Sequence, residues 1–104
     1  MSVTRVIIDP KRVTAHVFPP FDFLPLMAVG DSLTGPAINV TVWSGVDANP
    51  NAIWDTTTVI AGSIVSPGIQ NGIAGVIYLI RVTVTAGAKT LVLEGLLAVL
   101  PEGM

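Results

Sequence analysis

The last third of the chain, residues 72–100, constrains the fold more than any other stretch, because it reads as two β-strands joined by a short turn at residues 86–89. Side chains of the first strand alternate between two faces. The face that begins with Ile77 and Leu79 continues with the polar residues Arg81, Thr83 and Thr85. A solvated face of an antiparallel hairpin is normally polar. We therefore expect Ile77, Leu79 and Leu96 to lie beneath a neighbouring chain or beneath the protein's own N-terminal arm. One face of the first strand is apolar, and we predict that it fills the core: Val76, Tyr78, Ile80, Val82 and Val84.

The rest of the chain is broken into short segments by 10 glycines and 8 prolines, and no segment keeps the 3.6-residue period of an amphipathic helix. Short runs rich in Val, Ile and Thr at this spacing are typical of a β-sandwich or a barrel. We predict an all-β fold, an immunoglobulin-like antiparallel β-sandwich of six to seven strands with an N-terminal extended arm, and a small barrel is the alternative. The 104 residues suit one domain, with the arm at residues 1–12 and the sandwich at residues 13–104.

Two prolines mark an edge of the expected sheet. Residues 15–18 and 21–24 are expected to form one strand that Pro19 and Pro20 interrupt. Because proline removes a hydrogen-bond donor from the ladder, this strand belongs at an edge or at a bend. The other expected elements are strands at residues 38–44, 56–60 and 63–65, the last two joined by a tight turn at Ala61–Gly62, and loops at residues 45–54 and 67–72.

Composition excludes several classes of protein. The mean hydropathy is +0.74, yet the longest apolar run, residues 73–80, is far shorter than the roughly 20 residues of a membrane-spanning helix. The N-terminus lacks the pattern of a signal peptide, so we expect synthesis in the cytoplasm. The net charge of −2 argues against nucleic-acid binding, which needs clustered Lys and Arg. The absence of cysteine removes disulfides and thiolate chemistry.

The sequence offers little catalytic equipment. His16 is the only histidine, and no spacing singles out a nucleophile or an orienting group for it, so we interpret it as a structural residue. The loop that starts at Asp47, Asn49 and Asn51 begins like a calcium loop but has Ala52 and Thr58 where glycine and a carboxylate are required. We interpret it as a turn built by Asn and Asp side chains. We predict no enzymatic activity, no cofactor and no metal site.

Trp43 supports a sharper hypothesis. Along residues 38–44 it alternates with Ile38, Val40 and Val42, which places it on the opposite face with Asn39 and Thr41. If the three aliphatic residues fill the core, Trp43 lies at the surface, unless a loop covers it. An exposed tryptophan among small polar residues is a candidate anchor of a protein interface. It is also a candidate platform for a stacked sugar.

Several segments carry a resemblance to a known family: residues 26–33 (LMAVGDSL), 38–45 (INVTVWSG) and 75–78 (GVIY), and the apolar strand that ends in Val99. Over residues 21–100 the chain resembles small virion proteins of tailed bacteriophages, which share a Gly-Asp turn, an alternating strand, a Gly-x-x-Tyr strand opening and a last strand that finishes the chain. The resemblance implies a single immunoglobulin-like module in fibre-to-tail attachment or a related head-and-tail adaptor role. It brings no catalytic residues.

These observations favour a non-enzymatic structural component of a tailed-phage virion, and we predict an adaptor that links fibre to tail through multi-copy protein contacts. The alternatives are a capsid decoration protein and a carbohydrate-binding β-sandwich module that uses Trp43 or Trp54. The expected partners are other virion subunits in a multi-copy or homo-oligomeric arrangement, with no nucleic acid and no membrane. The expected location is the virion. The residues predicted to form the protein interface are Val6, Ile7, Ile8, Trp43, Ile77, Leu79 and Leu96.

Overall fold

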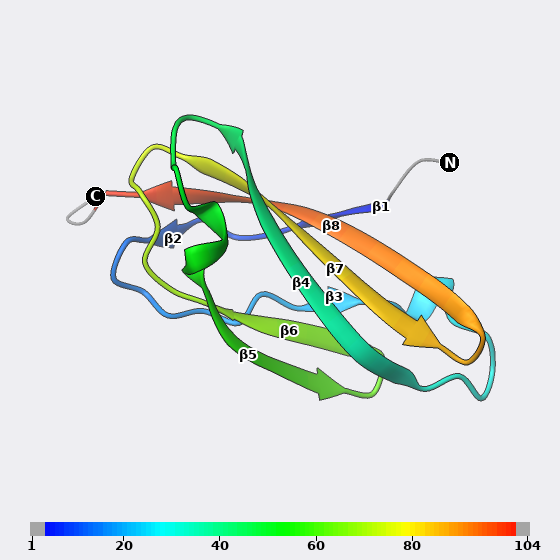
Figure 1. Cartoon of the computed structure of the whole chain (residues 1–104). Helices are drawn as coiled ribbons and strands as arrows, with labels where there is room; N and C mark the ends of the chain where they lie inside the picture. Colours follow the sequence, from blue (N-terminus) through cyan, green and yellow to red (C-terminus); the bar gives the residue numbers. More distant parts are fainter. Residues whose placement is uncertain (1–3, 102–104) are drawn as a thin grey trace.

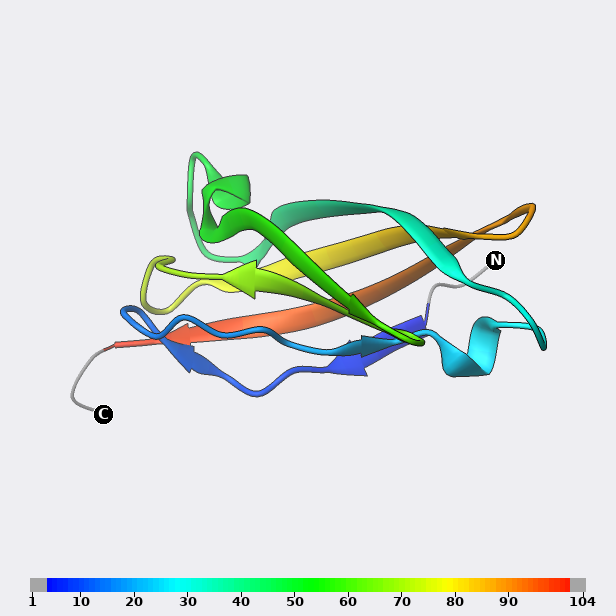
Figure 2. The same ribbon diagram turned by 90° about the horizontal axis from the view of Figure 1, so that it is seen from below.

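The computed structural model describes residues 4–101, apart from the side chains of Thr4 and Ile7. Within these residues, two sheets pack face to face (Figures 1 and 2), so the predicted all-β sandwich is confirmed. The large sheet has the order β1–β8–β7–β4, with β2 also paired to β8, and the small sheet has the order β3–β6–β5. The strands are β1 (Thr4–Ile7), β2 (Lys11–Arg12), β3 (Phe21–Asp22), β4 (Leu33–Ser44), β5 (Trp54–Ala61), β6 (Ile64–Ile69), β7 (Ile77–Ala86) and β8 (Lys89–Leu100), and two short 3₁₀ helices are η1 (Leu24–Leu26) and η2 (Pro50–Ile53).

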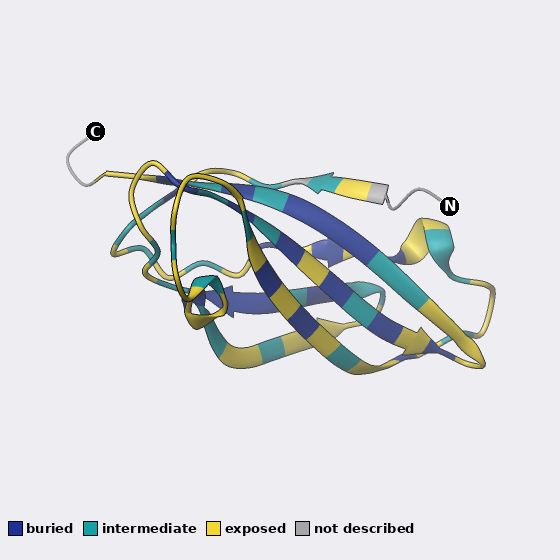
Figure 3. Ribbon diagram, turned by 45° about the horizontal axis from the view of Figure 1, so that its top comes forward, coloured by how far each residue is buried: buried dark blue, intermediate teal, exposed yellow. Residues whose placement is uncertain are grey.

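The terminal hairpin forms as the sequence predicts. β7 and β8 pair in antiparallel register up to Ala86 and Lys89, and Gly87 and Ala88 make the turn. Gly87 has a φ of 62°, which fits a type II′ turn with glycine in its first central position. The five residues predicted to fill the core are at most 3% exposed. Figure 3 shows the alternation of buried and exposed positions along β4 and β7 that produces this core.

The described part of the N-terminal arm belongs to the large sheet. β1 pairs in parallel with residues 93–96 of β8, and β2 pairs in parallel with Val99 and Leu100. Gly95 of β8 leaves room on the inner face for Ile8, because a Cβ at position 95 would collide with Ile8 Cδ1. The arm therefore docks in cis along the edge of β8, and it contributes Ile8 to the inside of the sandwich.

The small sheet contains a pair of facing prolines. Val17 exchanges two backbone hydrogen bonds with Ile69, and β3 pairs with β6 in the same register, so Pro19 lies opposite Pro67. Neither proline has an N–H to donate to the other. This missing rung divides the predicted edge strand into an isolated bridge at Val17 and the short β3, as the two prolines in sequence indicated.

Several sequence-based boundaries are wrong, including those of the strands expected at residues 56–60 and 63–65, which are β5 and β6. The predicted strand at residues 38–44 is the second half of the longer β4, whose register shift between Thr34 and Ala37 accommodates a bulge. The strand expected at residues 21–24 ends at Asp22, where η1 follows. The loop expected at residues 67–72 is too long, because β6 continues to Ile69. Pro67 is tolerated in this central strand because it lies opposite Pro19, so no hydrogen bond of the ladder is expected at this pair.

Candidate functional site

The outer face of the large sheet, on the side away from the small sheet, carries a row of charged residues. Strand pairing places Arg5 of β1 beside Glu94 of β8, Glu94 beside Arg81 of β7, and Arg81 beside Asn39 of β4. Arg81 donates from Nε and Nη2 to Oε2 of Glu94 at 2.9 and 2.7 Å. Arg5 Nε lies 3.9 Å from the other carboxylate oxygen. Glu94 is thereby buried to 5% exposure between two guanidinium groups that remain about half exposed.

Apolar residues form the next row of the same face. Leu79 of β7 pairs with Leu96 of β8, and Thr41 of β4 lies on the other side of Leu79. Ile77 follows one step further along β7, and all three apolar residues are half-buried. Neighbouring side chains on the same face partly cover Ile77, Leu79 and Leu96. The remaining exposed part is available to a partner.

Trp43 lies over this apolar row. The register shift between Val42 and Ser44 makes Trp43 the extra residue of a bulge, a feature that redirects a side chain. The guanidinium carbon of Arg5 lies 4.4 Å from the centre of its ring. Because β7 and β8 separate β4 from β1, these two side chains meet above the strands that carry Leu79 and Leu96. Trp43 remains 50% exposed, so no loop of the described chain covers it fully.

The structure divides the predicted interface residues between two environments. Trp43, Ile77, Leu79 and Leu96 lie together on the outer face, which we call the Trp43 face together with Arg5, Arg81 and Glu94. Val6 and Ile8 pack against the chain's own core. The side chain of Ile7 lies outside the described residues. Of the arm, Arg5 reaches over the outer face, whereas β1 itself lies beside β8 as an edge strand.

A shallow hollow of about 150 Å³ opens on the Trp43 face. Its walls are formed by Asn39, Thr41, Leu79 and Arg81. They combine an apolar surface, a guanidinium group, an amide and a hydroxyl. This combination can contact an apolar side chain of a protein partner or hydrogen-bond the hydroxyls of a sugar.

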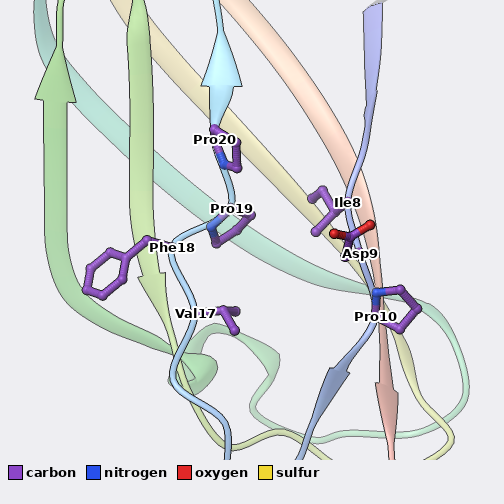
Figure 4. A pocket seen from close by; sticks show the side chains of 7 residues that line it. All are labelled: Ile8, Asp9, Pro10, Val17, Phe18, Pro19 and Pro20. Carbon is purple, nitrogen blue, oxygen red and sulfur yellow. The ribbon is translucent and has the colours of Figure 1, made fainter.

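A larger groove of about 320 Å³ lies at the edge of the sandwich, between the link from β1 to β2 and the proline-interrupted strand. Figure 4 shows Ile8, Val17 and Pro19 pointing into the space between these two segments, while the ring of Phe18 turns away from it. Pro10 and Pro20 complete the apolar walls, and Asp9 is the charged residue at its border. The groove therefore separates the edges of the two sheets with a mostly apolar lining.

His16 has a partner that its sequence context does not indicate. Its Nε2 lies 2.5 Å from Oδ2 of Asp55, and its ring packs against Phe18 with centroids 5.0 Å apart. Thr57 donates to Asp55 from its hydroxyl and, at 2.8 Å, from its backbone N–H. These bonds from Thr57, with His16 in addition, hold the pKa of Asp55 below its usual value. Because the Thr57 hydroxyl donates to the carboxylate, it is not directed to the imidazole as a triad nucleophile would be.

The Asp and Asn side chains that resemble the start of a calcium loop instead form hydrogen bonds that stabilise the loop. Asp47 accepts a hydrogen bond from the N–H of Asn49 at 2.9 Å and from the hydroxyl of Tyr78 at 2.7 Å. Asn51 accepts from the N–H of Val40. The interpretation as a turn built by Asn and Asp is confirmed. Within residues 4–101 no three His, Asp or Glu side chains gather in a way that could hold a metal ion.

The second tryptophan occupies a different environment. Trp54 packs against the core, and its indole N–H donates to the backbone oxygen of Thr57 at 2.9 Å. Of the two residues proposed as a sugar platform, Trp43 is therefore the one that exposes its ring. The sequence indicated this position through alternation, whereas the charged residues around it come from three other strands and share no motif.

Comparisons with protein-family models, with curated proteins and with solved structures found no significant match. The described part of the chain contains no helix long and apolar enough to cross a membrane. The Trp43 face and the resemblance of the sequence are therefore the two features that bear on function.

Proposed function

We propose that this chain is a non-enzymatic structural component of a tailed-phage virion, an adaptor that links fibre to tail through multi-copy protein contacts. Its partners would be other virion subunits, and its location the virion. The observation that carries the proposal is the Trp43 face, where half-buried Leu79 and Leu96 lie beside an exposed tryptophan and two arginines. Tryptophan and arginine are enriched among the residues that dominate the binding energy of protein interfaces.

The strand order supports an immunoglobulin-like assignment, which the resemblance implies. In immunoglobulin domains strands C, F and G share one sheet, and strands B, E and D share the other. Here β4, β7 and β8 belong to the large sheet, and β3, β6 and β5 form the small one. Taken in chain order from β3 to β8, the strands follow the same distribution. A module of this kind presents faces and edges to its neighbours, as an adaptor requires.

The proposal is tested by complementing particles that lack the protein with single-residue variants. Trp43→Ala and Leu79→Lys should reduce incorporation of the protein into particles, because each removes or charges the apolar centre of the face. Val46→Ala is the matched control, since Val46 is an apolar residue that is 83% exposed in a loop outside the face. Normal incorporation of both variants, with folding verified by circular dichroism, would exclude the Trp43 face as the contact.

The location within the particle separates the adaptor from the decoration protein. Quantitative mass spectrometry of separated heads and tails should find the adaptor with tails and fibres. A protein that copurifies with heads that lack tails would instead be a capsid decoration protein. The Trp43 face fits both locations, so incorporation alone does not distinguish them.

A carbohydrate-binding module is the second candidate, and the exposed Trp43 beside the hollow favours it. A sugar that stacks on an aromatic ring needs exposed ring surface, and Trp43 is 50% exposed with the Arg5 guanidinium carbon 4.4 Å from the centre of its ring. Titration with a panel of glycans, read by tryptophan fluorescence, should change the emission of the wild type and not that of Trp43→Phe if this function holds. Unchanged emission across the panel would count against it.

A further inference from the structure

The edges of the two sheets differ in how they are protected. Proteins normally blunt an exposed edge strand with proline, charge, a bulge or a covering segment. β4 contains Pro36, and the N–H of Val40 on its edge is bound by Asn51 Oδ1. The edge that includes β3 contains Pro19 and Pro20. These edges are poor templates for another strand.

The second half of β5 has none of these devices. Figure 1 shows β5 along the lower rim of the molecule, with β6 on one side only. Residues 58–61 contain no proline and no charge, and the stretch from residue 56 to residue 80 contains no charged side chain at all. The irregular pairing of β5 is confined to the part between Trp54 and Thr58. Val59 and Ile60 are 53% and 38% exposed.

The register shows which backbone groups point outward from this edge. Ile69 of β6 exchanges its backbone hydrogen bonds with Val17, on the side away from β5. By alternation, Ser66 and Ile64 bond to β5, where they are paired with Val59 and Ala61. The type II′ geometry of the turn at Gly62, with a φ of 62°, gives the same pattern.

It follows that the N–H and C=O groups of Thr58 and Ile60 point away from β6. Among residues 4–101 these groups have no strand or loop as a hydrogen-bond partner. The four groups occupy a regular half-strand that lies on the rim. They are the unpaired donors and acceptors that a further strand would bind.

We infer that β5 pairs with β5 of a second copy of this chain, in antiparallel register about a two-fold axis at Val59. In this register Thr58 of one copy exchanges both backbone hydrogen bonds with Ile60 of the other, and the reverse pair forms by symmetry. Val59 then faces Val59 across a non-hydrogen-bonded pair, where side chains approach most closely. The result is a continuous six-stranded sheet with the order β3–β6–β5–β5–β6–β3.

Self-complementarity is the reason to assign a second copy rather than another protein. An isologous contact requires one patch to satisfy itself under a two-fold rotation. Two outward-facing residues spaced two apart, with an exposed valine between them, meet this requirement. Residues 58–60, which form the proposed pairing, carry no charge, and Asp55 at the start of β5 lies outside them.

This inference is independent of the proposed role in the virion. A monomeric protein that is nevertheless found in tails would overturn the β5 pairing and leave the adaptor intact. A β5-paired dimer that is absent from particles would do the reverse.

Sedimentation velocity of the full chain, from micromolar to submillimolar concentration, tests the pairing. The wild type should form a dimer. Val59→Lys should weaken this dimer by at least ~10-fold, because it places two ammonium groups directly opposite each other. Val29→Lys is the matched control, since Val29 is fully exposed in a loop and its variant should dimerise like the wild type. A monomeric wild type, or a dimer that Val59→Lys does not weaken, would overturn the inference.

Cysteine cross-linking tests the register itself, and the chain contributes no cysteine of its own. Val59→Cys should form a disulfide-linked dimer rapidly under mild copper-catalysed oxidation, because directly opposed Cα atoms fall within disulfide range. Ala61→Cys lies on the same strand and face, but its two copies would be about 14 Å apart at roughly 3.4 Å per residue, so it should not cross-link. Equal cross-linking of the two variants would contradict a register centred on Val59.

Discussion

The two sheets of the sandwich differ in the interactions that stabilise each of them. The large sheet has strands of up to 12 residues, and its β7–β8 ladder runs from Ile77 to Ala86 without a register shift. The small sheet has a two-residue strand, a missing rung at Pro19 and Pro67, and a register shift in β5. It adds side-chain bonds instead, among them those of Asp55 and a bond from the Ser63 hydroxyl to Asp22 at 2.8 Å. The large sheet carries the half-buried Leu79 and Leu96 on its outer face, whereas the small sheet places the Asp55 carboxylate and the Thr57 hydroxyl over Gly68.

Two glycines, one in each sheet, leave space for these different interactions. Gly95 in β8 leaves space for Ile8 and Phe21 on the inner face, whereas Gly68 in β6 leaves space for the Asp55 carboxylate and the Thr57 hydroxyl. The first space is used by apolar packing and the second by a polar network. Filling each space therefore tests a different mode of stabilisation.

The largest effect is expected for Gly95→Val. The new side chain would occupy the position of Ile8 and press on Phe21, and overpacking of this kind costs about 3 kcal/mol or more in the free energy of unfolding. Urea unfolding monitored by tryptophan fluorescence measures the loss. The double variant Gly95→Ala, Ile8→Ala should be more stable than the sum of its single changes implies, because the two side chains compete for one space. Strict additivity would show that Ile8 does not occupy this space.

A smaller loss is expected for Gly68→Ala. The new methyl group would lie 2.5 Å from both carboxylate oxygens of Asp55 and from the Thr57 hydroxyl, and displacing them should cost about 2 kcal/mol. The same unfolding measurement applies. Gly62→Ala serves as a comparison, because its Cβ would meet no atom within 4 Å and its cost would come from the positive φ alone. A loss for Gly68→Ala no greater than for the comparison would contradict the steric argument.

Tyr78→Phe tests the polar contact inside the large sheet, with an expected loss of about 1.5 kcal/mol. The Tyr78 hydroxyl donates to Asp47 and accepts from the N–H of Ile73. Burial, together with the neighbouring Asp47 carboxylate, raises the pKa of Tyr78 to about 12. Since the folded pKa lies above the ordinary value of 10.0, the contribution of the Tyr78 hydroxyl to the free energy of unfolding is complete below pH 10. This contribution is lost as the pH rises towards 12. The stability difference between wild type and variant should narrow over this interval, and a constant difference would contradict the assignment.

The smallest effect concerns acid stability of the small sheet. Hydrogen bonds from Thr57, with His16 in addition, lower the pKa of Asp55 in the folded state. A depressed pKa gives stability that is present above the ordinary carboxyl value of 3.8 and is lost as the pH falls through the folded value. The difference in thermal stability between the wild type and Asp55→Asn should therefore be constant near neutral pH and decrease below pH 3.8. An advantage that persists undiminished in acid would show that the ionised carboxylate is not what stabilises the sheet.

The sequence predicted the features that depend on neighbours along the chain. Alternation predicted that Tyr78 and Ile80 share the core face, and the turn at Gly87 lies where a glycine allows a two-residue turn. Pro19 and Pro20 predicted an edge and an interruption. Trp43 was placed on the outer face by the same alternation. These features follow from the period of two in a strand and from the restricted backbone of proline, which operate over a few residues.

The tertiary structure alone decided which distant segments meet. It pairs His16 with Asp55, buries Glu94 between Arg5 and Arg81, and docks the arm in parallel along β8. No local pattern distinguishes these pairings, because a strand of given alternation satisfies its apolar face equally well beside several partners. Register between separate strands is fixed by what fits across them, such as Ile8 in the space above Gly95 and Pro19 opposite Pro67. The sequence by itself thus determined the faces and the turns of this protein, and the packing of the whole chain determined its polar networks and its edges.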